Sequence, residues 1–381
     1  MPRLRLLLLG YVLLVTVAAL IFAIAILSGP YRAVERSDYM TYHVAARIVL
    51  NGEGACLYDA ECQAAAQDAL IGDEPSFKRG ALPYNSPPWL AALVAPLGWL
   101  PLTAGFAVFT LVGLTLLAAS AWRLGWDRPA TRLAATLLLL TAWPTVMGAI
   151  RGQATLGVVG LLGLSVAGTR YWSGSALGLA ALKPTLVPLW ALWQVLGGHW
   201  RAVGTAAAVT LGLVGASALI VSPKAVADYP GHLLGVVGAG AVGVHPEEMI
   251  NWRGVAERLG WGGWLVAAGT LATLAMVAAT WWQARSRSIA AAAAFLATPL
   301  VIPHANQHEA VLAGVGILLA VAAAQRLRPA LSAGAIGTHL ILWSGPLLDA
   351  ELAAGLLFAA QLIWLGIIAV LARSLRPDTP R

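Results

Sequence analysis

Apolar runs long enough to cross a lipid bilayer recur along this chain, from Leu6 to Val370. A membrane-spanning helix needs about 20 consecutive, mostly apolar residues. Backbone polar groups must be hydrogen-bonded internally within lipid, so only helices and closed barrels span a membrane. Because these runs lack the alternating pattern of a barrel strand, they predict helices. The expected fold class is an all-α polytopic membrane protein, with residues 1–381 forming one multi-pass domain.

The charged residues fit a membrane protein better than a nucleic-acid-binding one. Only 11% of the chain is charged, whereas a soluble domain carries about 25%. The net charge of +7 comes from arginines that stand singly or in pairs between apolar runs. This spacing is typical of topology-setting charge on cytoplasmic loops. The expected partners are therefore membrane lipids and not nucleic acid.

The same arginines select a topology. The run Leu6–Leu27 is too long for the apolar part of a signal peptide, so it predicts a retained helix with its N-terminus inside. If residues 89–100 dip into the membrane and return, the next helix (102–122) delivers the following arginines to the cytoplasm. The prediction is 10 to 12 crossings with both termini inside. Alanine-, glycine- and arginine-rich usage fits a bacterium of high genomic GC, so we expect the bacterial inner membrane.

A first polar loop, residues 30–83, is expected on the extracytoplasmic side. In it, Ser37 is expected to cap a helix from Asp38 to Leu50 that Gly52 ends, and a second short helix is expected over 59–70. Cys56 and Cys62 lie in this loop. An extracytoplasmic loop permits a disulfide between them, and the alternative is two free thiols.

A second extracytoplasmic loop is expected over residues 222–260. His245-Pro246-Glu247-Glu248 is a reasonable helix start, with proline early and acids in the first turn. Apolar residues then fall near one face of the helix. Such a helix is expected to lie on the outer membrane surface.

Asp38 is the first candidate for chemistry. At a helix N-terminus its charged form is favoured, and an ionised carboxylate just above the membrane can accept a proton from an incoming hydroxyl. The alternative role is that of a capping carboxylate, and position alone favours that alternative.

Two cations interrupt or border apolar runs. Lys183-Pro184 divides the stretch 171–196 into two short pieces, and Arg151 precedes Gly152. A charge at such depth is costly unless it faces a cavity or a partner, and both residue types suit phosphate. The alternative for both is that the side chain extends to the membrane interface. Half-helices that meet at a charged site occur in transporters and membrane transferases.

His304 and His308 frame the segment Pro303–Glu309 at a helix junction. Two histidines four residues apart with a carboxylate can bind a metal. An imidazole can equally hydrogen-bond a phosphate or line a polar cavity, and the segment contains no third obvious ligand. We therefore expect no metal here. An anionic lipid head group held by the cations, with the acid acting on a second substrate, would explain this set of residues.

These motifs resemble, in order and spacing, the polyprenyl-phosphate-dependent glycosyltransferases of family 87 in the GT-C superfamily. The resemblance covers roughly Ser37 to Leu312. The motifs that carry it are Asp38-x-x-x-Tyr42-x-x-Ala45, Leu50-x-Gly52, Leu57-Tyr58-Asp59, Tyr84-x-x-Pro87-Pro88, Gly152-Gln153, Gly178-Leu179-Ala180 before Lys183-Pro184, Asn251, and Pro303 with His308. The chain departs from the family at Tyr39, where Phe is common, and at Trp252-Arg253 after Asn251.

The resemblance implies a GT-C-type fold with short extracytoplasmic juxtamembrane helices and an extracytoplasmic active site. It implies an inverting transferase that moves a sugar, usually mannose, from a polyprenyl-phosphate donor to a hydroxyl of a glycolipid or glycan acceptor. Asp38 would be the general base, and His308 would lie near the donor phosphate. Lys183, Arg151 and His304 are the further expected phosphate ligands, and the expected substrate-binding residues are Tyr42, Tyr84, Gln153 and Asn251. Because cations would compensate the phosphate, no cofactor is expected.

Two other classes of protein share some of these features. A transporter or flippase of an anionic lipid or solute also uses broken helices and intramembrane cations. A non-catalytic polytopic assembly partner would tolerate loss of Asp38. The acid on a large extracytoplasmic helical loop and the absence of an inverted repeat favour the transferase.

Overall fold

The computed structural model describes residues 37–71, 82–237, 245–284, 286–325 and 327–374, with the single positions 10, 17 and 34. The run Leu6–Leu27 lies outside the described residues apart from two positions, so its prediction as a retained helix stays untested. The described residues form 17 α-helices and no strand, which confirms the all-α fold class.

The α-helices follow one another in this order: α2 (Tyr39–Leu50), α3 (Ala60–Ile71), α4 (Pro88–Val94), α5 (Leu102–Arg123), α6 (Pro129–Leu140), α7 (Trp143–Ile150), α8 (Thr155–Ala167), α9 (Arg170–Ala180), α10 (Pro188–Leu196), α11 (Trp200–Ile220), α12 (Pro223–Val237), α13 (Trp252–Arg258), α14 (Gly263–Gln283), α15 (Arg287–Val301), α16 (Val311–Ala323), α17 (Arg328–Leu342) and α18 (Ala350–Ser374). Short 3-10 helices stand between them: η1 (Gly54–Cys56), η3 (Ala95–Trp99), η4 (Pro184–Leu186), η5 (Pro246–Glu248), η6 (Gln307–Ala310) and η7 (Gly345–Leu347).

Four described helices are long and apolar enough to cross a membrane, namely α5, α11, α14 and α18. The pair α6 and α7, bent by 56° at their junction, makes a fifth if it counts as one span. Leu211 and Leu219 on α11 are 70% and 90% exposed. Leucines this exposed on an apolar helix of 21 residues indicate a surface that faces lipid, and the chain is a multi-pass membrane protein.

Among the described residues, the number of full-length apolar helices is lower than the predicted 10 to 12 crossings. Several apolar runs fold as shorter helices, because turn residues divide them. For example, α8 and α16 have 13 residues each and end before they match the usual thickness of a bilayer. The stretch 89–100 folds as the short helices α4 and η3, as expected of a segment that does not cross.

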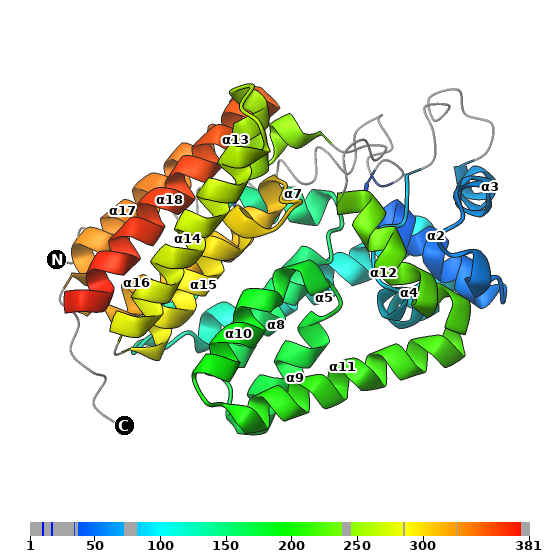
Figure 1. Ribbon diagram of the computed structural model, residues 1–381, viewed down its shortest axis with the longest axis horizontal. Helices are drawn as coiled ribbons and strands as arrows, with labels where there is room; N and C mark the ends of the chain where they lie inside the picture. Colours follow the sequence, from blue (N-terminus) through cyan, green and yellow to red (C-terminus); the bar gives the residue numbers. More distant parts are fainter. Residues whose placement is uncertain are drawn as a thin grey trace.

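The helices form two packed groups (Figure 1). In one group α15 packs against α14, α16 and α18. In the other, α8 packs against α5 and α9, and α9 packs against α11. Helices α2, α3, α4 and α12 lie together on the far side of the second group, at the right of Figure 1.

The first polar loop contains the two predicted helices, α2 and α3, within one residue of the expected bounds. Gly52 follows α2 with a positive φ of 77°, a conformation that glycine adopts without strain. The predicted Ser37 cap is wrong, since its hydroxyl donates to the Val34 carbonyl 2.6 Å away. Cys56 and Cys62 are joined in a disulfide, the first of the two alternatives.

The second polar loop differs from the prediction in two ways. Residues 223–237 form the unpredicted helix α12, and the segment at His245 forms only the short turn η5. Helix α13 begins later, at Trp252, because the Asn251 side chain caps it by accepting from the Gly254 N–H at 3.0 Å. The Trp252 indole donates to Thr273 of α14 at 2.9 Å. Helix α13 therefore packs on α14, and its predicted place on the outer membrane surface stays a prediction.

Close packing of α5 on α8 depends on a glycine. A Cβ atom at Gly160 would lie 2.5 Å from the Leu116 carbonyl carbon and 2.6 Å from the Leu117 nitrogen. At Gly157, one turn earlier in α8, the nearest atom to such a Cβ is 3.7 Å away. Of these two glycines, Gly160 alone has no room for a methyl group.

We expect Gly160→Ala to lower the free energy of unfolding by about 1–3 kcal/mol, since the backbone of α5 would have to move. Gly157→Ala is the matched control and should be neutral or stabilising by up to about 1 kcal/mol, because alanine favours helix. Thermal unfolding in detergent micelles measures both. Equal melting temperatures for the two variants would contradict the packing described.

Candidate functional site

The turn between α7 and α8, Arg151 to Ala154, receives the start of α2. Gly152 has a positive φ of 60°, and a Cβ there would collide with the Tyr39 side chain. The Tyr39 N–H donates to the Arg151 carbonyl at 3.2 Å. A glycine at this position thus lets two distant segments meet backbone to backbone.

This contact places Asp38 beside Gln153. The Gln153 amide donates to the Asp38 carboxylate, and Gln153 itself is buried. Asp38 makes no side-chain capping bond to α2, so the capping alternative is wrong. The carboxylate is half-buried, which leaves it both oriented and accessible.

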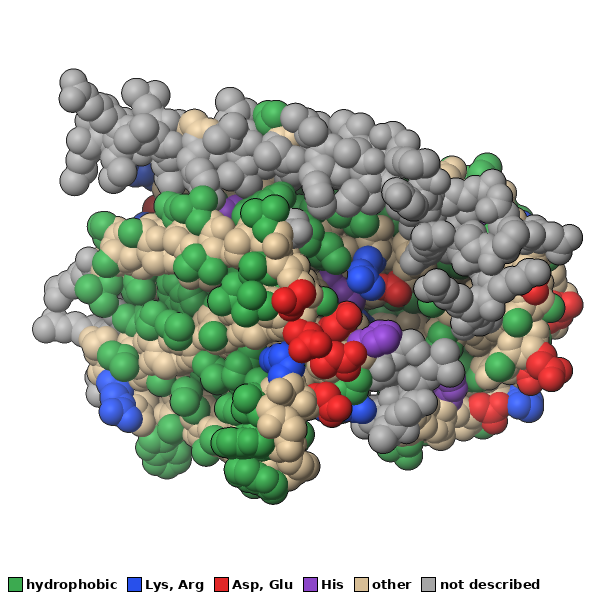
Figure 2. Space-filling view, turned by 90° about the horizontal axis from the view of Figure 1, so that it is seen from above, with side chains coloured by type: hydrophobic (Ala, Val, Ile, Leu, Met, Phe, Trp, Pro, Cys, Tyr) green, Lys and Arg blue, Asp and Glu red, His purple; other side chains and the backbone are tan. Residues whose placement is uncertain are grey.

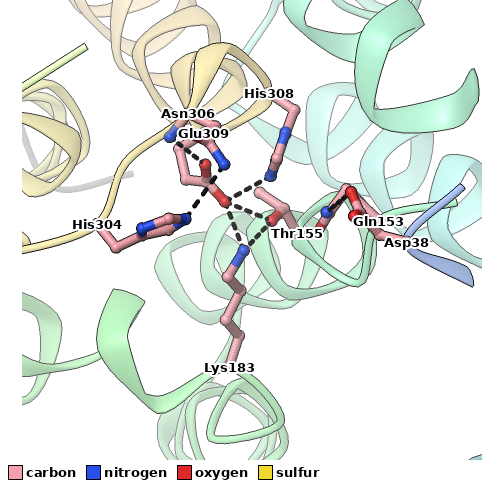
Figure 3. A network of polar contacts seen from close by, with 8 residues as sticks. All are labelled: Asp38, Gln153, Thr155, Lys183, His304, Asn306, His308 and Glu309. Atoms are coloured by element: carbon pink, nitrogen blue, oxygen red, sulfur yellow. Dashed lines mark hydrogen bonds and ion pairs between the residues drawn. The ribbon is translucent and has the colours of Figure 1, made fainter. Parts of the chain in front are cut away.

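A second polar cluster surrounds the Glu309 carboxylate, which is 1% exposed (Figure 3). Its Oε1 accepts from the Lys183 ammonium and from the Thr155 hydroxyl at 3.0 Å, and it lies 2.9 Å from His308 Nε2. Its Oε2 accepts from the Asn306 backbone N–H at 2.7 Å. A buried carboxylate needs such partners because removing it from water is costly.

The Lys183 ammonium reaches this cluster from the break between α9 and α10. The Trp89 indole fixes the break by donating to the Ala181 carbonyl at 2.7 Å. Lys183 donates to Thr155 at 2.8 Å as well as to Glu309, and its side chain is 25% exposed. An ammonium has three donors. Within the described part of the chain two are used, which leaves one for a ligand.

The α7–α8 turn and the first residue of α8 join the two clusters. Gln153 holds Asp38, and Thr155, two residues later, holds Lys183 and Glu309. Figure 3 shows both sets of contacts meeting at this point, with side chains that come from the residue before α2, the α7–α8 turn, the start of α8, the α9–α10 break, and η6 with the segment that leads into it. An acid and a pair of basic groups are thus fixed on either side of one rigid turn.

His304 lies at the edge of the cluster, where its Nε2 is 3.2 Å from the Asn306 amide. Burial lowers the pKa of His304 below its usual value, although nearby Glu309 opposes this effect. A neutral imidazole can hydrogen-bond a ligand but adds no positive charge.

The other predicted site residues lie outside the network in Figure 3. Arg151 contributes its carbonyl to the contact with α2, and the residue is exposed. The Tyr42 ring is 6% exposed and packs edge-on against Tyr84. Tyr84 is 1% exposed, and its hydroxyl donates to the Pro87 carbonyl at 2.8 Å. Asn251 is also buried, and its amide donates to the Ile302 carbonyl at 2.8 Å.

The predicted role of Tyr84 and Asn251 in substrate binding stays a prediction. Both use their polar atoms to hold the fold. Gln63 of α3 also accepts from the Tyr84 N–H at 2.7 Å, which ties the segment before α4 to the first loop.

Sequence reasoning missed the roles of Glu309, Thr155 and Asn306. In the sequence, Glu309 suggests only a metal ligand beside His304 and His308. An acid at the entrance of the apolar helix α16 was nevertheless a signal, because a carboxylate there requires a cationic partner. The described residues contain no group of three His, Cys, Asp or Glu side chains placed to hold a metal ion.

We expect Lys183→Met and Glu309→Gln each to lower the free energy of unfolding by about 3 kcal/mol, because each leaves a buried polar partner uncompensated. The loss of unfolding free energy in the double variant should be about 1–3 kcal/mol smaller than the sum of the losses in the two single variants. Thermal unfolding of the four proteins measures this coupling. The exposed pair Lys224–Asp228 (2.5 Å) is the control, and Lys224→Met should cost less than about 1 kcal/mol. Additive losses at Lys183 and Glu309 would contradict the pairing.

Comparison with known proteins assigns the chain to a family. The model of glycosyltransferase family 87 matches residues 84–305, more than half of the chain. This segment contains Gln153, Thr155 and Lys183, and it ends just before η6. Neither the curated proteins nor the solved structures contain a match. The chain belongs to glycosyltransferase family 87.

Proposed function

We propose that this glycosyltransferase moves a sugar, mannose, from a polyprenyl-phosphate donor to a hydroxyl of a glycolipid or glycan acceptor, with inversion of the anomeric centre. The observation that carries the proposal is the arrangement of an accessible carboxylate, Asp38, and a basic pair, Lys183 and His308, around the α7–α8 turn. A transporter or flippase has no need for such an oriented acid.

Asp38 would act as the general base. Gln153 occupies one carboxylate oxygen, Oδ2, and so orients the other towards an acceptor hydroxyl. The acceptor oxygen would attack the anomeric carbon while Asp38 removes its proton and the bond from that carbon to the phosphate oxygen breaks. Attack from the face opposite the phosphate converts a β-linked donor into an α-linked product. The transition state has oxocarbenium character, as in other glycosyl transfers.

Lys183 and His308 would stabilise the charge that grows on the leaving phosphate. Before the donor binds, Glu309 balances the charge of Lys183 and orients both groups. The remaining N–H of Lys183 would then point to a phosphate oxygen. His304 would add a neutral hydrogen bond, and Arg151, which is exposed, would have to turn inwards to contribute.

The proposed location is the bacterial inner membrane, with the active site on the extracytoplasmic side. The disulfide between Cys56 and Cys62 supports this side for the first loop, because structural disulfides persist in oxidising compartments. Acidic side chains gather near the middle of the face seen in Figure 2, beside His and Lys or Arg, and hydrophobic side chains cover its left part. The part of this face with acidic side chains suits contact with water, and the part covered by hydrophobic side chains suits contact with lipid. The proposal includes that the chain has a GT-C-type fold.

We expect Asp38→Asn to reduce the transfer rate by about 100-fold or more while the protein stays folded, since asparagine still accepts the Gln153 hydrogen bond but cannot take a proton. The assay is transfer of radiolabelled mannose from polyprenyl-phosphate mannose to a membrane lipid extract. Asp68→Asn is the matched control, an exposed acid in the same loop, and should leave transfer unchanged. Equal transfer by wild type and Asp38→Asn would remove Asp38 from the mechanism.

The cations proposed at the phosphate also make a metal ion unnecessary. We expect the same transfer assay to proceed at an unchanged rate in excess EDTA. Loss of activity in the chelator that added divalent metal restores would show that this part of the proposal is wrong. The stereochemistry is tested on the isolated product, whose linkage should be α from a β-linked donor.

A further inference from the structure

Apart from the site described above, a polar cavity of about 430 Å³ lies between the ends of α8, α9, α10, α11 and α15. Helix α8 starts at Thr155 in the site described above and ends beside Gly168, which lines this cavity. The 13 residues of α8 make it about 20 Å long. The cavity is therefore separate from the Asp38 and Glu309 clusters and lies at the opposite end of α8.

Three helices begin at this cavity, since Arg170, Trp200 and Arg287 are the first residues of α9, α11 and α15 and all line it. None of the three N-caps makes a side-chain capping bond. Helix N-termini carry partial positive charge and free N–H groups, which favour an anion. Figure 1 shows α9 and the start of α11 at the lower edge of the molecule.

Arginines add to this positive potential. Arg170, Arg201 and Arg287 line the cavity, and no Asp or Glu is among its described lining residues. A cation at a helix N-terminus has the unfavourable sign for the helix dipole. The pKa of His199 is lowered by burial and by Arg287, as expected in a positive field. A bound anion would reverse these unfavourable interactions.

Two buried polar atoms in the wall have no partner among the described residues. They are the side-chain oxygen of Gln194, a residue with no exposed surface, and Nδ1 of His199. The Gln194 amide nitrogen is directed to Ser173 at 3.3 Å. An unpaired buried acceptor is costly, so the Gln194 oxygen calls for a donor such as a ligand hydroxyl.

The rim of this cavity has the character of a membrane interface. Trp200, which lines the cavity at the start of α11, is 65% exposed, and Trp172, two residues after the lining residue Arg170 in α9, is 76% exposed. Exposed tryptophans at helix ends are typical of the head-group level of a bilayer. The expected topology puts this end on the cytoplasmic side.

We infer that the cavity binds a phosphate ester that also carries a hydroxyl group, as in the glycerol head group of phosphatidylglycerol. The arginines and helix N-termini would hold the phosphate, and the Gln194 oxygen would accept from the hydroxyl. The exposed tryptophans favour a membrane lipid as its source over a soluble glycerol phosphate.

The test uses the full-length protein in detergent micelles and isothermal titration with short-chain phosphatidylglycerol. Arg170→Gln with Arg201→Gln should weaken binding about tenfold or more, because charge-assisted bonds to phosphate are lost. Arg123→Gln with Arg128→Gln is the matched control. It removes the same charge from two exposed arginines outside the cavity, and it should change the dissociation constant less than about twofold.

Phosphatidylethanol, which is anionic but has no hydroxyl, tests the role of Gln194. It should bind the wild type about two- to tenfold more weakly than phosphatidylglycerol, and Gln194→Leu should remove this difference. The lipid comparison on wild type stands even if that variant does not fold. Glycerol 1-phosphate distinguishes the sources: binding of the lipid alone assigns a bilayer ligand, and binding of the soluble ester alone assigns a soluble one. Binding of neither, or equal losses in both arginine pairs, would overturn the inference.

Discussion

The buried carboxylate of Glu309 is the constraint on which the arrangement of the site depends. A charge inside an apolar helix bundle must be paired, and Glu309 takes its partners from three separate parts of the chain. Lys183 is drawn from the α9–α10 break, and Thr155 from the start of α8. Because these partners come from both helix groups, satisfying one carboxylate also fixes how the groups meet.

The same turn that supplies Thr155 supplies Gln153, and this explains why Asp38 lies where it does. Gly152 has no side chain, whereas any larger residue there would collide with Tyr39 at the start of α2. The Tyr39 N–H can therefore donate to the Arg151 carbonyl in the turn. Asp38 is left with Gln153 as its partner instead of the amides of its own helix. The position of the proposed base is thus a consequence of backbone packing.

The two ends of α8 differ in how their charges are balanced. At the Thr155 end, Glu309 compensates the charge of Lys183 within the chain and lies against His308. At the Gly168 end, three arginines and three helix N-termini meet without an acidic residue among the described lining. This cavity combines an excess of positive charge with buried polar atoms that have no partner among the described residues. These are the properties of a site that binds an anion from outside the chain.

Several features follow from local chemistry along the sequence alone. The apolar runs required helices in lipid, Gly52 ended α2, and Lys183-Pro184 broke the stretch between α9 and α10. These follow from residue solvation and backbone freedom, which act over a few positions. Tertiary structure decided which residues became partners: Gln153 for Asp38, Lys183 for Glu309, and Asn251 for its own helix end and Ile302. Long-range pairings of this kind depend on which surfaces pack together. A single polar residue can satisfy its hydrogen bonds with several different partners, and the residues next to it in the sequence do not show which partner it takes.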